Sequence, residues 1–174
     1  MNNILLTGSP GIGKTTAIMK SIELINAPVV GFFTEEIRDN DNKKRIGFRI
    51  VSSQNRESKI LAHIEFNTRF NVGKYKVKPD NLLQFLKEID EAVDNRDDVC
   101  IIIDEIGKME LFTAGFKETV NKALESKHPL IATIMKGSNK FCDQVKNRND
   151  VSLIEVTEKN RDYLPNKISG NLLN

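Results

Sequence analysis

The feature that most constrains this chain is a glycine-rich run near its start. Residues 8–15 read Gly-Ser-Pro-Gly-Ile-Gly-Lys-Thr and match the pattern G-x-x-x-x-G-K-[ST] at every fixed position. The apolar run Ile4 to Thr7 precedes it, and Ile18 and Ile22 follow at helical spacing. We therefore expect a strand, a tight turn and a helix, in that order. Such a turn points backbone N–H groups and a helix N-terminus at one place, which is typical of a phosphate-binding site.

Each part of this run has an expected task. The glycines let the backbone curl around phosphate groups, Lys14 is expected to reach the β- and γ-phosphates, and the Thr15 hydroxyl to ligate Mg²⁺. Thr16 is expected either to contact the α-phosphate or to be an ordinary first-turn residue. The predicted nucleotide-binding residues are Gly8, Ser9, Pro10, Gly11, Ile12, Gly13, Lys14, Thr15 and Thr16. The alternative, a strand-to-helix turn with an incidental lysine, is disfavoured because both flanks agree with the motif.

Short apolar runs alternate with longer helical periods along the chain. The predicted strands are 4–7, 29–34, 46–51, 99–103, 130–134 and 152–156, and the helical periods cover 18–25, 82–93 and 112–124. Several strands are apolar on consecutive residues, which indicates burial on both faces. The pattern predicts an α/β fold with a mostly parallel sheet, helices on both faces and ligands at the carboxyl ends of the strands. Residues 31–51 break the pattern and predict a β-hairpin insertion with a polar turn at 39–42.

Two carboxylates, Asp104 and Glu105, directly follow the apolar strand at 99–103. Carboxylates at the end of a buried strand are costly unless a cation meets them, and Mg²⁺ is the natural partner. Asp104 is therefore predicted to hold the metal together with Thr15, and Glu105 to polarise a water that attacks the γ-phosphate. A water-activating glutamate favours hydrolysis over transfer to another small molecule. The alternative is a solvated strand end or a helix cap.

Four further residues have open roles. Arg161 is a candidate catalytic residue, because Asn160 and Arg161 are expected to begin a short helix on the ligand side of the sheet; a structural ion pair is the alternative. Lys108 and Glu110 are expected either to neutralise charge and order the loop, or to form an ion pair on a solvated turn. Thr133 is either a γ-phosphate sensor or a buried threonine bonded to backbone.

Composition limits the class of protein. A chain of 174 residues is long enough for one domain, here predicted as 1–174. Its 26 basic and 24 acidic residues leave a charge of +2, too small to draw nucleic acid or a membrane from a distance. Cys100 and Cys142 are expected to be buried free thiols. The start, Met1-Asn2-Asn3, has no basic segment and no long apolar stretch follows it, so we expect a cytoplasmic protein, and a monomer.

The run at 104–111, Asp-Glu-Ile-Gly-Lys-Met-Glu-Leu, together with the glycine-rich loop and Gly-Phe-Phe-Thr-Glu-Glu-Ile-Arg at 31–38, resembles a known family. It is similar to the small P-loop nucleoside-triphosphatases, which include the cancer-related nucleoside triphosphatase. Further matches lie at 45–48, 72–75 and 156–162, so the resemblance covers nearly the whole chain. It implies a P-loop NTPase fold of the additional-strand, catalytic-glutamate class.

The resemblance also implies an activity: slow, Mg²⁺-dependent hydrolysis of several nucleoside triphosphates, ATP and GTP among them, to diphosphate and phosphate. By position, it implies that Gly13, Lys14 and Thr15 bind phosphate and metal, that Asp104 binds the metal and that Glu105 binds the water. No Asn/Thr-Lys-x-Asp segment that reads guanine is present in the sequence, which agrees with broad base tolerance.

Two other classes of protein stay open at this stage. A nucleotide or small-molecule kinase would need an acceptor pocket and a lid with paired arginines, and no clear lid is visible in the sequence. A nucleotide-dependent RNA-binding switch would use basic residues around the hairpin, with Tyr75 as the aromatic that could stack on a base. Those basic residues are Arg38, Arg45, Arg49, Lys74 and Lys76.

Overall fold

The strands of this protein form one sheet whose two halves differ in direction. The computed structural model describes residues 3–41 and 43–172, and the side chains of all of these except 171 and 172. Within them the strand order is β5-β6-β4-β3-β2-β7-β8-β1-β9. The strands are β1 (Asn3–Thr7), β2 (Val29–Arg38), β3 (Arg45–Ser52), β4 (Ser58–His63), β5 (Asn71–Val72), β6 (Tyr75–Val77), β7 (Cys100–Ile106), β8 (Leu130–Ile134) and β9 (Val151–Glu155).

The central sheet, β2-β7-β8-β1-β9, is parallel throughout. This confirms the predicted α/β fold with a mostly parallel central sheet. The predicted hairpin is β2 and β3, which pair antiparallel, and β4, β6 and β5 continue the sheet beyond it. The antiparallel wing is therefore larger than the hairpin that the sequence predicts. β5 and β6 are too short to show a strand period, and β4 has only three consecutive apolar residues between polar ones.

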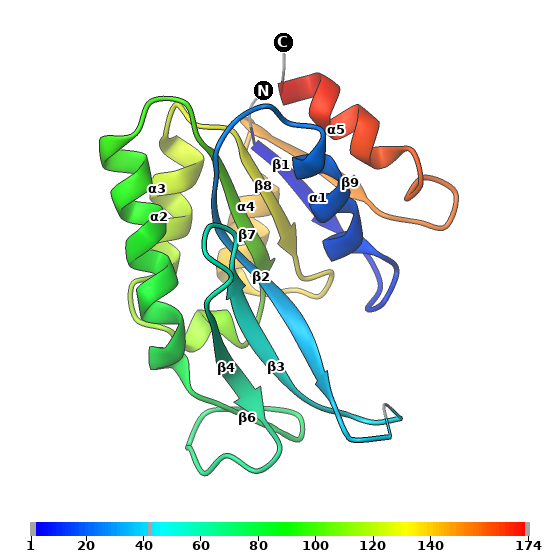
Figure 1. Cartoon of the computed structure of the whole chain (residues 1–174), viewed down its shortest axis with the longest axis vertical. Coiled ribbons are helices and arrows are strands. Elements are labelled where there is room, and N and C mark those ends of the chain that lie inside the picture. The colour runs from blue at the N-terminus through cyan, green and yellow to red at the C-terminus, as the bar shows by residue number, and fades with distance from the viewer. Residues whose placement is uncertain (1–2, 42, 173–174) are drawn as a thin grey trace.

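Helices cover both faces of the central sheet. They are α1 (Lys14–Glu23), α2 (Leu83–Asn95), α3 (Phe116–Glu125), α4 (Lys140–Lys146) and α5 (Leu164–Leu172), with short 3₁₀ turns η1 (Pro79–Leu82) and η2 (Glu110–Phe112). Figure 1 shows α2 and α3 on one side of the sheet and α1 and α5 on the other, while the β2-β3-β4 wing extends away from them.

Alternate residues of the central strands enter two separate cores. On β7, Ile101 and Ile103 pack with α2, α3 and α4, whereas Cys100 and Ile102 pack with α1 and α5. This explains why the strands are apolar on consecutive residues, as expected for a sheet buried on both faces.

Two helix predictions differ from the structure. The helix predicted over 112–124 begins only at Phe116, since residues 110–112 form a 3₁₀ turn and Phe112 is 38% exposed. The helix expected to begin at Asn160 and Arg161 begins instead at Leu164, because residues 158–163 form turns.

The structure also shows the two cysteines and most of the polar turn for which the sequence gave expectations. Cys100 and Cys142 are buried and free, as predicted, and burial raises the pKa of the Cys100 thiol to about 12. In the polar turn Asn40 and Asp41 are exposed, whereas Asn42, like residues 1 and 2, lies outside the described residues. In the described part of the chain, no helix has both the length and the apolar character needed to cross a membrane.

Candidate functional site

The glycine-rich loop joins β1 to α1 at the carboxyl edge of the parallel strands. Gly13 lies in the left-handed region and caps α1, which begins at Lys14. The Lys14 ammonium folds back over the loop and donates hydrogen bonds to the carbonyls of Gly8 (3.1 Å) and Ser9 (3.2 Å). The predicted strand, turn and helix are thus present, and the lysine reaches back across the loop.

Three elements converge on Asp104, near the end of β7. Its side chain is 2% exposed, so the alternative of a solvated strand end is wrong. The Thr15 hydroxyl of α1 donates to Oδ2 at 2.7 Å, and the Thr133 hydroxyl of β8 donates to Oδ1 at 2.5 Å. From β2, the Thr34 hydroxyl donates to the backbone oxygen of Asp104 at 2.6 Å. Thr133 is therefore buried, as one alternative predicted, but it bonds the acidic side chain instead of backbone; its role as a γ-phosphate sensor stays a prediction.

Burial dominates the electrostatics of the acidic pair. It raises the pKa of Asp104, against hydrogen bonds from Thr133 and Thr15 that lower it. Burial also raises the pKa of Glu105; the Asp104 charge adds to that rise and the Lys14 ammonium opposes it. A cation beside Asp104 would relieve the cost of holding these charges away from water.

The donor set around Asp104 fits Mg²⁺. Magnesium prefers oxygen ligands and is held in proteins by one or two carboxylates, with substrate phosphates and water completing its octahedron. The Asp104 carboxylate and the Thr15 hydroxyl are such oxygen ligands, and they lie 2.7 Å apart next to the loop. These are the two residues that the sequence predicts as metal ligands.

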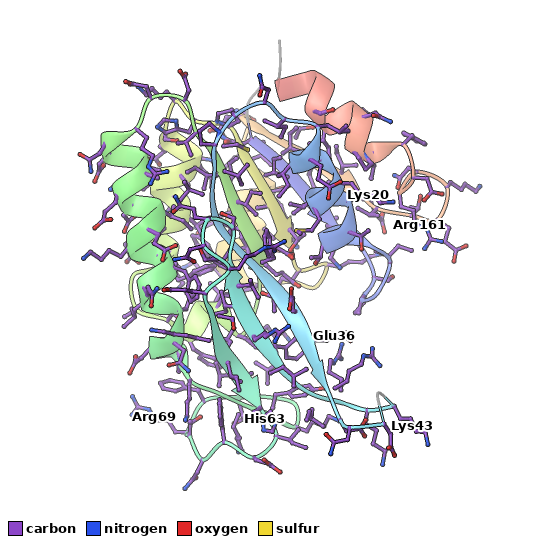
Figure 2. All side chains as sticks on the ribbon, in the orientation of Figure 1. Lys20, Glu36, Lys43, His63, Arg69 and Arg161 are labelled. Carbon is purple, nitrogen blue, oxygen red and sulfur yellow. The ribbon has the colours of Figure 1, made fainter. Side chains whose placement is uncertain are left out.

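Two hollows flank the loop and share Gly11, Gly13 and Thr16. The first, of about 260 Å³, is lined by Pro10, Gly11, Gly13, Lys14, Thr15, Thr16, Thr34, Glu36, Arg45, Phe48, Asp104 and Glu105. The second, of about 320 Å³, is lined by Gly11, Ile12, Gly13, Thr16, Ala17, Lys20, Arg161 and Asp162. Figure 2 shows Lys20 and Arg161 beside α1, with Glu36 some way off on β2. Because the acidic pair lines only the first hollow, that hollow suits the terminal phosphate and the second suits the nucleoside.

This arrangement separates Arg161 from the acidic pair. Arg161 is exposed, and none of the ion pairs among the described residues includes it, so the structural ion pair offered as an alternative is absent there. Asn160 stabilises the turn that carries Arg161. Its side-chain amide donates a hydrogen bond to the carbonyl of Glu155 at 2.8 Å and accepts one from the backbone N–H of Thr157 at 2.8 Å. A catalytic role for Arg161 stays a prediction, and its position favours contact with the nucleoside.

The basic residues of the hairpin are largely paired. Arg38 and Arg45 form ion pairs with Glu36, and Arg49 forms one with Glu35. Tyr75 is only 9% exposed, and its hydroxyl accepts a hydrogen bond from Arg45 Nε at 3.0 Å. Tyr75 is thus a packed wing residue, and the expectation that it stacks on a base is wrong.

Sequence reasoning gave no site role to the wing residues that line the first hollow, namely Thr34, Glu36, Arg45 and Phe48. They lie on β2 and β3, at the place where the parallel part of the sheet continues into the antiparallel wing. The segments 31–38 and 45–48, which contain these residues, contributed to the family resemblance, but nothing in their pattern places them beside the loop.

The family model, the related sequences and the solved structures that this chain matches all belong to nucleoside triphosphatases. Residues 3–169 match the model of the family described as NTPase. The chain is 57% identical to nucleoside-triphosphatase THEP1 of Natranaerobius thermophilus over 97% of this chain and 94% of that protein, and 45% identical to that of Thermotoga maritima over 95% and 92%. Among solved structures, it resembles THEP1 from Aquifex aeolicus (TM-score 0.85, 32% identity, 99% of each chain) and a human cancer-related nucleoside triphosphatase (TM-score 0.81, 31% identity, 99% and 97%).

Proposed function

The chain belongs to the NTPase family and is an enzyme of the nucleoside-triphosphatase type; on that premise, we propose that its reaction depends on Mg²⁺, uses water as the acceptor and tolerates several bases. The observation that carries this proposal is the first hollow, in which the glycine-rich loop, Lys14 and the acidic pair face one another. Phosphoryl transfer needs positioning and charge stabilisation rather than covalent catalysis, and these groups supply both.

The loop and Lys14 bind and orient the triphosphate. The amides at the start of α1 face the phosphates, and the helix N-terminus adds partial positive charge. In the structure the Lys14 ammonium is shared between two loop carbonyls. Phosphate oxygens compete for that ammonium with a full negative charge, so bound nucleotide draws it to the β- and γ-phosphates.

Glu105 orients the attacking water and takes its proton. The water oxygen bonds to the γ-phosphorus, the bond from that phosphorus to the bridging oxygen breaks, and a proton passes to the Glu105 carboxylate. Burial raises the pKa of Glu105, which makes it a stronger proton acceptor than an exposed glutamate. Thr15 and Asp104 would hold the Mg²⁺, which, when bound, neutralises charge on the β- and γ-phosphate oxygens.

The residues that line the second hollow, where the nucleoside is proposed to lie, support the proposed base tolerance. Lys20, Arg161 and Asp162, which line the second hollow, are exposed side chains on a helix and a turn. Exposed, flexible groups discriminate weakly between bases, since strong discrimination needs buried polar groups that a wrong base leaves unpaired.

The test is phosphate release from ATP, GTP, CTP and UTP, each with Mg²⁺ or with EDTA. We expect release from all four with Mg²⁺ and almost none with EDTA. Lys14→Ala should lose most nucleotide affinity by calorimetry, while Lys87→Ala, on the exposed face of α2, should not. Release that EDTA leaves unchanged would contradict the metal dependence, and release from a single nucleotide would contradict the base tolerance.

One observation favours a second candidate function, phosphoryl transfer to a small acceptor. The first hollow continues past the acidic pair to Arg45, Glu36 and Phe48. There the Arg45 guanidinium lies over the Phe48 ring, 4.9 Å from its centroid, and pairs with Glu36. This pair offers both donors and acceptors, which suits a hydrogen-bonding acceptor such as a nucleoside monophosphate. If γ-labelled ATP gives only free phosphate with each monophosphate added, this candidate is removed.

A further inference from the structure

Glu110 is a buried acid that the proposed reaction does not yet use. It opens η2, six residues after Asp104, and is only 4% exposed. None of the ion pairs found within the described residues includes Glu110, and its neighbour Lys108 is exposed. The ion pair on a solvated turn that the sequence allowed is therefore wrong for Glu110.

Gly107 brings this acid next to Glu105. A Cβ atom built on Gly107 would lie 3.0 Å from Oε2 of Glu110 and 3.1 Å from Oε1 of Glu105. The two carboxyl oxygens thus lie near the same point, and they are no farther apart than the sum of these two distances. Both carboxyl groups therefore border the space that a side chain would fill at residue 107.

The environment favours the neutral form of Glu110. Burial is the largest cause and the Glu105 charge the second, and together they raise the pKa of Glu110 to about 8. Hydrogen bonds from the backbone N–H groups of Glu110 and Gly107 act in the opposite direction and lower it. A protonated carboxyl presents an O–H donor to a neighbouring carboxylate and adds no second negative charge. It can therefore support Glu105 without repelling the γ-phosphate.

We propose that Glu110 is a positioning residue that holds the Glu105 carboxylate in the orientation needed by the attacking water, and that Gly107 leaves free the space that both acids border. The inference rests on the proposed role of Glu105. A half-buried glutamate has three rotatable bonds, and a misplacement of about 1 Å at a reacting group lowers a rate roughly 100-fold. A fixed neighbour on the side away from solvent restricts those rotations.

A purely structural role accounts poorly for Glu110. A buried carboxyl without a cation destabilises a fold, and an apolar side chain of similar size would pack there at lower cost. Residues that are unfavourable for stability and lie beside catalytic groups are characteristic of functional sites.

The first test compares Glu110→Leu and Glu110→Gln with Glu118→Gln, an exposed glutamate on α3, in steady-state kinetics with Mg²⁺ and ATP. Glu110→Leu should lower kcat about 10- to 100-fold with KM changed less than threefold, since the nucleotide contacts stay intact. Glu110→Gln keeps the size and an N–H donor and should recover most of that loss. A Glu110→Leu enzyme with wild-type kcat, or one whose KM rises as much as kcat falls, would overturn the proposal.

A second variant covers the case in which Glu110→Leu does not fold. Gly107→Ala places a methyl group about 3 Å from a carboxyl oxygen of each acid. Gly170→Ala is its control, because a Cβ there would meet no atom of a neighbouring element within 4 Å in the part of the chain that the structure describes. We expect Gly107→Ala to lower kcat at least about tenfold, with ATP affinity unchanged by calorimetry. Unchanged kcat in a folded Gly107→Ala protein would contradict the proposal.

A double-mutant cycle separates this inference from the proposed function. If Glu110 acts through Glu105, then Glu110→Leu should cause no further loss in a Glu105→Gln background. Additive losses would overturn the positioning role. A Glu105→Gln enzyme with wild-type activity would remove the role of Glu105 itself, whereas an inactive Glu105→Gln beside a fully active Glu110→Leu would remove only the inference.

Discussion

At the scale of single residues, Asp104 is the point at which the parts of the site meet. Thr15 and Thr133 donate to its two carboxylate oxygens, and Thr34 donates to its backbone oxygen. These hydroxyls come from α1, β8 and β2, so one buried residue links the loop and the central sheet through its carboxylate and the wing through its backbone oxygen. Hydrogen bonds to a charged group are worth about 1.5–3 kcal/mol, which makes this arrangement both stable and rigid.

Glu110 should make stability depend on pH. Its pKa is raised from the ordinary 4.5 to about 8 in the fold. Between these values the folded chain binds a proton that the unfolded chain has lost, so the contribution of Glu110 is fully present below pH 4.5 and is lost as pH rises through 8. In urea unfolding without Mg²⁺ or nucleotide, the stability of Glu110→Gln relative to wild type should rise by a few kcal/mol from pH 5 to pH 8. A difference that stays constant over this range would contradict the burial of an unpaired acid.

Arg161 should affect binding more than chemistry. It lines the second hollow, away from Glu105. Loss of one exposed contact to the nucleotide corresponds to a 2- to 10-fold rise in KM, with kcat nearly unchanged. The control is Arg69→Ala, at the far end of the wing in Figure 2. If Arg161→Ala lowers kcat 100-fold at unchanged KM, the residue is catalytic, as the sequence suggested, and the assignment of the two hollows is wrong.

At the scale of elements, the contact between β2 and β7 positions the wing against the site. Gly31 of β2 pairs with Ile102 of β7, and its φ of 139° is in a region that favours glycine. A Cβ on Gly31 would lie only 1.9 Å from the carbonyl oxygen of Ile102. The strands can therefore lie close enough for Thr34 to reach Asp104 only because residue 31 has no side chain.

Gly31→Ala tests this contact directly. The added methyl meets rigid backbone in an unfavourable conformation, so we expect a loss of about 2–4 kcal/mol in the free energy of unfolding. Urea denaturation measures it, with Gly170→Ala as the matched control. A loss below about 0.5 kcal/mol would show that β2 and β7 can separate without cost.

At the scale of the whole molecule, local signals predict the centre of the fold and little of its edges. The loop, the acidic pair and the buried strands were predictable because spacing along the chain carries each of them. The wing strand β5 has two residues and α4 has seven, which is too short for a period to show. The place of Glu110 was unpredictable for a different reason. The sequence left open whether Lys108 and Glu110 neutralise charge and order the loop or form an ion pair on a solvated turn, and only the backbone after β7 brings Glu110 near Glu105.

The measurement that tests the proposed role of Glu105 most directly is phosphate release from Mg²⁺–ATP by Glu105→Gln, made together with ATP binding by calorimetry. We expect kcat to fall at least about 100-fold, because a positioned general base contributes roughly 10²- to 10⁴-fold, while ATP affinity stays within a few-fold of wild type. Phosphate release near the wild-type rate by a variant that binds ATP normally would contradict this role, since Glu105 would then not be the group that activates water.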